Sequence, residues 1–451
     1  MAPVTPQSTT ARCSAPSARE VIARDGDAAP QSYRLAREAF LAGDDIPFAR
    51  YTSQDFFDTE IERMWSRTWQ WACRAEQIAG TGDYLVYDVG PYSALVVRQQ
   101  DGSIRAFVNS CPHRGMQFAS AGETGSGKQF IRCPFHGMSW QLDGTLRDIP
   151  CRWDFPHIEA EQFGLAEILC DTWGGFVFVN FDTRAPELAE YLGVLPEHFR
   201  TFPLDRRQVS LHIQKILPGN WKMCVEAFLE AFHVLATHPE GARYTADACA
   251  NYDVFDKHVS RFMHSLGVPS PHFEQRISDA DVVAAMGFDP SDMTGDQTAR
   301  EYVADCLRTQ FGDAFGVDLG GTSTAQIIDS VQYFLFPNAF FFPGVLLRLV
   351  YRFRPLTRDS CIFEILVLDP LPEGVSPKKP PAPVRLDKDQ PYACVPGFDF
   401  AQVFDQDVEN FHRQWAGIKA SRKGAQTLAS YQESRIRHLH STLDEYLVTP
   451  S

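Results

Sequence analysis

The pattern of apolar and polar positions divides the chain into four segments, and the first two contain few apolar runs. Residues 1–32 are rich in Ala, Ser, Thr and Pro and lack apolar periodicity, so we expect a flexible tail. Residues 33–75 carry apolar side chains at helical spacing, among them Ile61, Met64 and Trp65. This spacing predicts a helical segment, and we expect it to pack on the domain that ends the chain.

Short strands broken by Gly and Asp dominate the third segment, residues 76–180. Apolar runs at 84–87, 94–97 and 175–179 predict strands, and Asp-Gly pairs between them predict turns. We therefore expect a small all-β domain in this segment.

Helical and strand-like patterns are mixed in the fourth segment, residues 181–451. The expected helices cover residues 220–236, 400–419 and 425–446, and the expected strands cover residues 331–336, 340–342, 346–353 and 362–368. An all-β domain followed by a larger mixed domain makes the predicted fold class α+β.

Charge and composition then limit the partners. The 451 residues include 42 basic and 57 acidic side chains, a net charge of −15, which argues against nucleic acid as a partner. No run approaches the roughly 18 apolar residues of a membrane span, and the N-terminus lacks the apolar segment of a secretory signal. We therefore expect a cytoplasmic protein with no membrane partner. Its eleven cysteines, an odd number spread over the chain, favour reduced thiols over a disulfide scaffold.

Two Cys-His pairs in the all-β segment form the first candidate site. Cys111 and His113 are followed, after 19 intervening residues, by Cys133 and His136. Two thiolates and two imidazoles suit a tetrahedral zinc site, or a Rieske [2Fe–2S] cluster with the thiolates on one iron and the imidazoles on the other. Zinc modules usually place both Cys before both His, whereas each motif here has one of each. This order favours the cluster, with structural zinc as the alternative.

The helix expected at 220–236 leads into the second candidate site. Glu226, Glu230 and His233 are spaced i, i+4 and i+7, so they should share one helix face. His238 lies five residues after His233 and a proline follows it, so the helix must distort or end before His238. Both imidazoles could then converge on one metal ion.

Together the two motifs resemble those of the Rieske non-haem iron oxygenases, in which an acidic residue precedes two His ligands. The resemblance is to the large (alpha) subunit of the aromatic-ring-hydroxylating oxygenase family and covers roughly residues 45–445. It implies a small all-β Rieske domain at 76–180 and a helix-grip (START-like) catalytic domain with a central antiparallel sheet at 181–451.

The resemblance also implies which residues hold the two iron centres. His233 and His238 would bind a mononuclear Fe(II), and Glu230 would act in catalysis by connecting this iron to the cluster. The implied cluster ligands are Cys111, His113, Cys133 and His136.

A site with two His and one carboxylate needs one more acid, and it leaves positions open for oxygen. The family places this acid on a C-terminal helix, where Asp405, Asp407 and Glu409 are the candidates. The acid-x-x-Asn pattern favours Asp407. We also expect Asn220 to contribute to catalysis.

The implied activity is that of a terminal oxygenase component, which uses O2 to hydroxylate an organic, apolar or aromatic substrate. Electrons would come from NAD(P)H through a separate reductase, with or without a ferredoxin, because the chain has no nucleotide-binding Gly motif and no further Cys cluster. The implied oligomer is a homotrimer or an α3β3 assembly.

Two other functions compete with this interpretation. Many relatives carry Asp at the position of Glu230, and Glu resembles a subset that acts on quaternary ammonium and other non-arene substrates, so monooxygenation or oxidative demethylation competes with ring hydroxylation. A zinc-binding hydrolase is the alternative from a different class. Phe228, Phe232 and the aromatic run at 333–342 could line an apolar cavity, although alternating residues of such strands more often form core.

Overall fold

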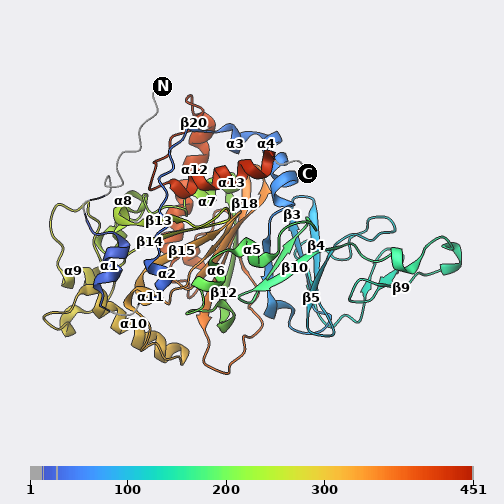
Figure 1. Ribbon diagram of the computed structural model, residues 1–451, viewed down its shortest axis with the longest axis horizontal. Helices are drawn as coiled ribbons and strands as arrows, with labels where there is room; N and C mark the ends of the chain where they lie inside the picture. Colours follow the sequence, from blue (N-terminus) through green and yellow to red (C-terminus); the bar gives the residue numbers. More distant parts are fainter. Residues whose placement is uncertain (1–12, 14, 27–28, 449–451) are drawn as a thin grey trace.

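The computed structural model describes residue 13 and residues 15–26 and 29–448, which form two lobes (Figure 1). A strand-rich lobe extends to one side and ends in the loops around β9 (Leu146–Asp148). The larger lobe contains a broad sheet with helices packed over it. Among the described residues, no helix combines the length and the apolar character that crossing a bilayer requires.

The smaller lobe consists of two antiparallel sheets, one with the strand order β2-β11-β10-β5-β4-β3-β6 and one with the order β7-β8-β9. A buried cluster that includes Val86, Phe107 and Trp140 packs the two sheets together, and Cys111 and Cys133 belong to this cluster. The remaining strands of the lobe are β2 (Gln70–Arg74), β3 (Tyr84–Val89), β4 (Tyr92–Arg98), β5 (Ile104–Val108), β6 (Thr124–Gly125), β7 (Ile131–Arg132), β8 (Ser139–Trp140), β10 (Glu167–Trp173) and β11 (Phe176–Asn180).

The larger lobe is built on an eight-stranded sheet with the order β13-β14-β15-β16-β17-β18-β12-β19. All neighbours are antiparallel except β12 and β19, which run parallel. The strands are β12 (Arg207–Pro218), β13 (Asn251–Val254), β14 (Val259–His264), β15 (Ser330–Leu335), β16 (Ala339–Phe341), β17 (Leu349–Thr357), β18 (Ser360–Pro370) and β19 (Val384–Leu386). The four predicted strand regions correspond to β15–β18, whereas the sequence did not indicate β12–β14.

Helices α7, α12 and α13 lie over this sheet (Figure 1). They enclose the largest buried cluster, which includes Trp221, Phe404, Trp415 and Leu439. The α-helices are α1 (Ala18–Arg24), α2 (Gln31–Arg34), α3 (Ala49–Thr52), α4 (Gln54–Glu60), α5 (Leu188–Leu192), α6 (Leu195–His198), α7 (Trp221–Glu226), α8 (Val234–Thr237), α9 (Asp279–Ala285), α10 (Ala299–Phe315), α11 (Thr324–Ile328), α12 (Ala401–Ala420) and α13 (Ser434–Val448). A short two-stranded sheet pairs β1 (Ile46–Pro47) with β20 (Ala425–Gln426).

The aromatic run at 333–342 forms core on both faces of the sheet. Phe334 and Phe340 belong to the cluster under α7 and α12, whereas Tyr333 and Phe341 belong to the cluster on the opposite face. Phe228 joins the first of these clusters and is only 9% exposed. The core interpretation therefore describes these residues better than a cavity lining.

The predicted tail and the predicted start of the all-β domain both need correction. Residues 1–12 and 14 lie outside the described residues, but α1 follows directly, and Val21 and Ile22 are buried. The tail interpretation is therefore wrong for α1, because a helix this short is stabilised by tertiary packing, and Ala18 and Ile22 belong to a buried cluster of the larger lobe. The all-β sheet begins with β2, which pairs with β11, so the domain starts before residue 76.

The helical segment that follows the N-terminal region is docked by buried polar groups. Glu60 of α4 and Lys222 of α7 form an ion pair with an Nζ–Oε1 distance of 2.6 Å, and neither side chain is exposed. Tyr51 donates a hydrogen bond to Glu226 of α7 (2.6 Å), and the same carboxylate contacts His440 of α13 (2.8 Å) and Gln426 (3.1 Å). These contacts hold α3 and α4 against the two helices that cover the sheet.

We expect Glu60→Ala to lower the free energy of unfolding by about 3–5 kcal/mol, because it leaves the Lys222 ammonium buried without a counter-charge. Urea denaturation monitored by circular dichroism measures this loss. Glu409→Ala, which breaks the exposed Glu409–Arg413 pair, is the control and should cost less than about 1 kcal/mol. Equal losses for the two variants would contradict the docking role of the buried pair.

Candidate metal centres

Two loops of the smaller lobe present the Cys-His pairs, and both have the same backbone geometry. The Gly115 N–H donates to the carbonyl of Cys111 (2.9 Å), and the Gly137 N–H donates to the carbonyl of Cys133 (3.1 Å). Each Cys N–H in turn donates to the carbonyl of the residue after the glycine, at 2.8 and 2.9 Å. Both glycines have positive φ, 76° and 78°, which allows each loop to close so tightly.

The four predicted cluster ligands lie together where these loops meet. Both thiols are buried at 2% exposure, whereas His113 is half-buried and His136 is exposed, with 4.9 Å between their ring centroids. Burial raises the pKa of Cys111, and the adjacent Cys133 thiol adds to this rise. A donor set with the thiols inside and the imidazoles at the surface fits a two-iron cluster that has its thiolate-bound iron buried.

The segment 220–236 is not one continuous helix, so this part of the prediction is wrong. α7 ends at Glu226, a turn follows, and α8 is a single helical turn. Glu226 therefore does not share a helix face with Glu230 and His233. The Glu230 carboxylate accepts a hydrogen bond from the His233 N–H (3.0 Å), which replaces a helical backbone bond at the start of α8.

His233, His238 and Asp407 converge on one point. Each offers a ligand atom, and these atoms lie within 4.8 Å of one another. Asp407 Oδ1 is 3.1 Å from His238 Nε2 and 3.5 Å from His233 Nε2. As predicted, α8 ends before His238, whose φ of −124° turns the chain out of the helix. Two Nε2 atoms and a carboxylate oxygen facing a common point are the donor set of a two-His-one-carboxylate metal site.

The second nitrogen of each imidazole faces an oxygen. His233 Nδ1 lies 2.7 Å from Glu230 Oε1, and His238 Nδ1 lies 2.7 Å from Gln406 Oε1. An acceptor at Nδ1 holds the proton there and leaves Nε2 able to bind a metal. Sequence reasoning missed Gln406, although its position directly before Asp407 is a usable signal.

The charges around the site favour a cation. Burial lowers the pKa of His233, but Glu230 and Asp407 raise it, and the net pKa is about 9. The carboxylates that stabilise an imidazolium also stabilise a bound metal ion, which displaces the proton. The residues present therefore fit a divalent cation such as Fe(II).

The register of α12 selects Asp407 as the inward-facing acid. Phe404, Asp407, Val408 and Phe411 are all buried and recur at helical spacing, so Asp407 lies on the apolar stripe of the helix. Hydrogen bonds between α12 and the segment around α8 fix this register: Gln406 to Glu240 at 2.8 Å and Asn410 to Thr237 at 3.1 Å.

The other residues predicted for this site do not reach it. Asp405 accepts a hydrogen bond from the Tyr392 N–H (2.7 Å), and Glu409 forms an exposed ion pair with Arg413. Asn220 caps the start of α7, where its side-chain oxygen accepts from the Lys222 N–H (3.1 Å). Both Asn220 side-chain N–H bonds go to backbone carbonyls, so its amide supports the helix rather than the metal site.

A cluster-binding β lobe combined with a two-His-one-carboxylate centre defines the class of Rieske-type iron oxygenases. Two family models match the chain, the Rieske [2Fe-2S] domain over residues 68–159 and the ring hydroxylating alpha subunit (catalytic domain) over residues 199–449. The second model covers more than half of the 451 residues, so the chain belongs to the ring-hydroxylating alpha subunit family. The predicted resemblance, fold class and pair of iron cofactors are thereby confirmed, and the zinc-binding hydrolase is set aside.

Relatives of two kinds match part of the chain. The chlorobenzene dioxygenase alpha subunit of Cupriavidus sp. is 34% identical over 194 residues, which are 42% of this chain and 42% of that protein. The carnitine monooxygenase oxygenase subunit of Escherichia coli is 31% identical over 196 residues, 43% of this chain and 52% of that protein. The matches therefore span about half, or less, of these relatives' length.

Solved structures of a monooxygenase and of a dioxygenase share the fold. The quaternary ammonium Rieske monooxygenase CntA superposes with a TM-score of 0.62 at 17% identity, over 89% of this chain and 95% of that one. A naphthalene 1,2-dioxygenase variant superposes with a TM-score of 0.61 at 17% identity, over 91% of this chain and 94% of that one.

We expect Asp407→Ala to lower the iron content from about three atoms per chain to about two, because it removes one of three ligands of the single iron and leaves the two-iron cluster intact. Metal analysis by mass spectrometry and the visible spectrum of the cluster measure the two outcomes. Glu409→Ala, on the exposed side of α12, is the matched control and should keep all three. Full iron content in Asp407→Ala would exclude this residue as a ligand.

Proposed function

We propose that the protein is the terminal oxygenase component of a multicomponent system that hydroxylates an organic substrate with O2. The observation that carries this proposal is the presence of both donor sets, two Cys with two His and two His with Asp407, in one chain. The electrons would come from NAD(P)H through a separate reductase, with or without a ferredoxin. When bound, the cluster supplies single electrons and the mononuclear Fe(II) supplies the site for O2.

The chain's own residues would position these two centres. Cys111 and Cys133 would hold the inner iron of the cluster, and the more exposed His113 and His136 form the edge through which electrons enter and leave. Glu230 would hold His233 with its Nε2 directed at the iron, as the 2.7 Å contact at Nδ1 indicates.

We propose a homotrimer or α3β3 assembly, and apolar exposure at both centres supports an interface that places the Rieske lobe of one protomer against the next. Met116 and Phe135 beside the cluster ligands are 43% and 54% exposed, and Phe232 and Leu235 beside His233 are 53% and 40% exposed. Large apolar side chains gathered at a site in this way are typical of interfaces. In such an assembly Glu230 would also connect the mononuclear iron to a cluster imidazole of the neighbouring protomer.

Two classes of substrate are candidates for this activity. The chlorobenzene dioxygenase relative supports an apolar or aromatic substrate, and ring hydroxylation is the first candidate. One observation favours the second candidate, oxidation of a quaternary ammonium or other cationic substrate. Asp247 is 2% exposed, its Oδ1 has no hydrogen-bond partner among the described residues, and its charge acts on His233. A buried carboxylate near the iron site suits a cationic substrate better than an arene.

A substrate panel with a surrogate reductase tests both candidates. The panel contains monocyclic and bicyclic arenes and quaternary ammonium compounds. We expect one of these two classes to give product coupled to NADH oxidation, measured as product formed per NADH consumed. Asp247→Asn separates the candidates, because loss of the charge should raise KM for a cationic substrate and leave KM for an arene unchanged. No coupled product from either class would contradict the proposed function.

We expect Glu230→Ala to keep the visible spectrum of the cluster and to lose turnover by about 10–100-fold or more, because His233 loses the acceptor that orients it. Glu230→Asp retains a carboxylate and should recover part of the rate. Reoxidation of the reduced cluster in a single turnover, followed by its absorbance, measures electron transfer directly. An unchanged reoxidation rate in Glu230→Ala would rule out the connecting role.

A further inference from the structure

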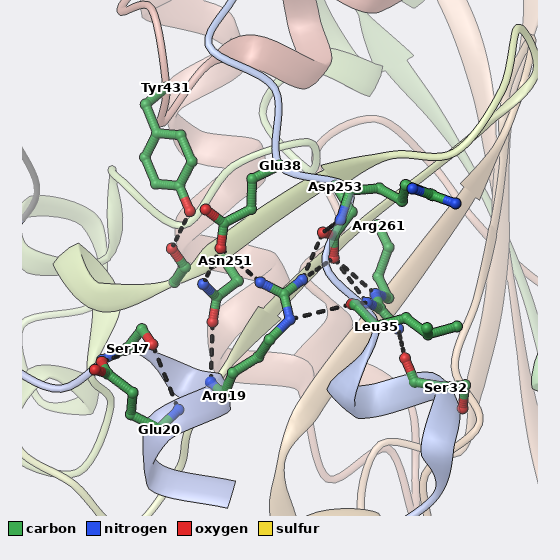
Figure 2. A network of polar contacts seen from close by, with 12 residues as sticks. Ser17, Arg19, Glu20, Ser32, Leu35, Glu38, Asn251, Asp253, Arg261 and Tyr431 are labelled. Atoms are coloured by element: carbon green, nitrogen blue, oxygen red, sulfur yellow. Dashed lines mark hydrogen bonds and ion pairs between the residues drawn. The ribbon is translucent and has the colours of Figure 1, made fainter. Parts of the chain in front are cut away.

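The N-terminal strap, which we define as the described residues from Cys13 to Glu38, is fastened across β13 and β14 of the catalytic lobe. Figure 2 shows the centre of this attachment. The Arg19 guanidinium lies 2.5 Å from Asp253 and 2.5 Å from Glu38, and the Arg19 backbone N–H donates to Asn251 Oδ1 (3.0 Å). The strap therefore follows the segment that contains Asn251 and Asp253.

A thiol pair lies at the beginning of this strap. The Sγ atoms of Cys13 and Cys249 are 3.0 Å apart, although the two residues are 236 positions apart in the chain. Cys249 is 5% exposed and Cys13 is half-buried, so only one of the two thiols is accessible from outside. Neither residue belongs to the predicted metal ligands.

The partner of Cys13 belongs to the 3₁₀ helix η7 (Asp247–Cys249). Its first residue, Asp247, is the buried carboxylate whose charge raises the pKa of His233. A covalent bond at Cys249 would therefore join the strap to the turn that places this carboxylate.

We propose that Cys13 and Cys249 are a peroxide-oxidised thiol pair that reversibly fastens the strap to η7. Hydrogen peroxide oxidises the Cys13 thiol to a sulfenic acid and is itself reduced to water. The Cys249 thiol then attacks the sulfenic sulfur, the S–S bond forms, and the hydroxyl leaves as a second water. Two thiols and one peroxide thus give one disulfide and two waters, and a dithiol reverses the reaction by thiol–disulfide exchange.

The surroundings assign different roles to the two thiols. Cys13 is the accessible thiol, and its Sγ accepts a hydrogen bond from the Ala15 N–H (3.4 Å), which holds the sulfur in place at the start of the strap. Burial raises the pKa of Cys249, so this thiol is a poor first target for an oxidant. It is instead the resolving thiol, already in contact with the sulfur that it must attack.

The test uses the iron-loaded full chain, with hydrogen peroxide itself as the probe. Protein treated with peroxide is denatured in the presence of the alkylating reagent, so that buried thiols also react, and is then digested with trypsin without reduction. Cleavage after arginine and lysine places Cys13 in peptide 13–19 and Cys249 in peptide 244–257, each with no other cysteine. We expect the cross-linked pair of these peptides to appear by mass spectrometry together with the loss of both free thiols, and dithiothreitol should abolish it.

Cys13→Ser and Cys249→Ala should each prevent this cross-link, whereas Cys394→Ser, which changes an exposed cysteine elsewhere, should leave it unchanged. A second readout is the melting temperature, which should rise on oxidation of the unmodified chain and not of Cys13→Ser, since the bond closes a long loop. The proposal is overturned if peroxide leaves both peptides alkylated, or if Cys13 is oxidised beyond the sulfenic acid without linking to Cys249. Because peroxide is added directly, neither outcome depends on oxygenase activity.

Discussion

The arrangement of the catalytic lobe depends on one constraint: Asp407 must lie close enough to His233 and His238 for all three to bind one metal ion. The three ligand atoms come from segments about 170 residues apart in the chain, yet they lie within 4.8 Å of one another. This is possible because the chain leaves the helical path after Glu226 and again at His238, so both Nε2 atoms turn toward α12. Glu230 and Gln406 then fix the imidazoles from behind, and Glu240 and Thr237 fix α12 relative to them.

Helix α7, which precedes the metal-binding segment, has polar partners of its own. α7 carries Lys222 and Glu226, which contact Glu60, Tyr51 and His440 and not the metal ligands. These buried charges are expensive to desolvate unless they are paired, so they specify one docking arrangement for the N-terminal helices. The start of α7 is thus held on one side by packing over the sheet and on the other by this polar network. Precise placement of a metal site requires such support from groups that never touch the metal.

Motifs with a strong chemical signature could be predicted from the sequence, whereas backbone paths set by tertiary contacts could not. The Cys-His loops, the two iron-site histidines and the acid-x-x-Asn pattern gave the residues that the structure brings together, and the apolar stripe of α12 explains why Asp407 differs from Asp405 and Glu409. The break between α7 and α8 was missed, because the hydrogen bonds that replace the helix come from Glu230 and from Tyr252, a distant residue. β12 was missed for a similar reason. Its polar residues, such as His212, are buried beside Glu364 of β18, so its sequence lacks the apolar pattern of a core strand.

The carboxylates around the mononuclear site bear on the two substrate classes proposed above. Three carboxylates, those of Glu230, Asp247 and Asp407, act on His233. A divalent metal ion held by His233, His238 and Asp407 would lie among these carboxylates. Glu230 and Asp407 both contact an imidazole, whereas Asp247 Oδ1 has no hydrogen-bond partner among the described residues. A buried carboxylate of this kind is stabilised by a cation or by a strong hydrogen-bond donor. If the protein acts as proposed, a positively charged or hydrogen-bonding substrate would satisfy Asp247 more fully than an arene would.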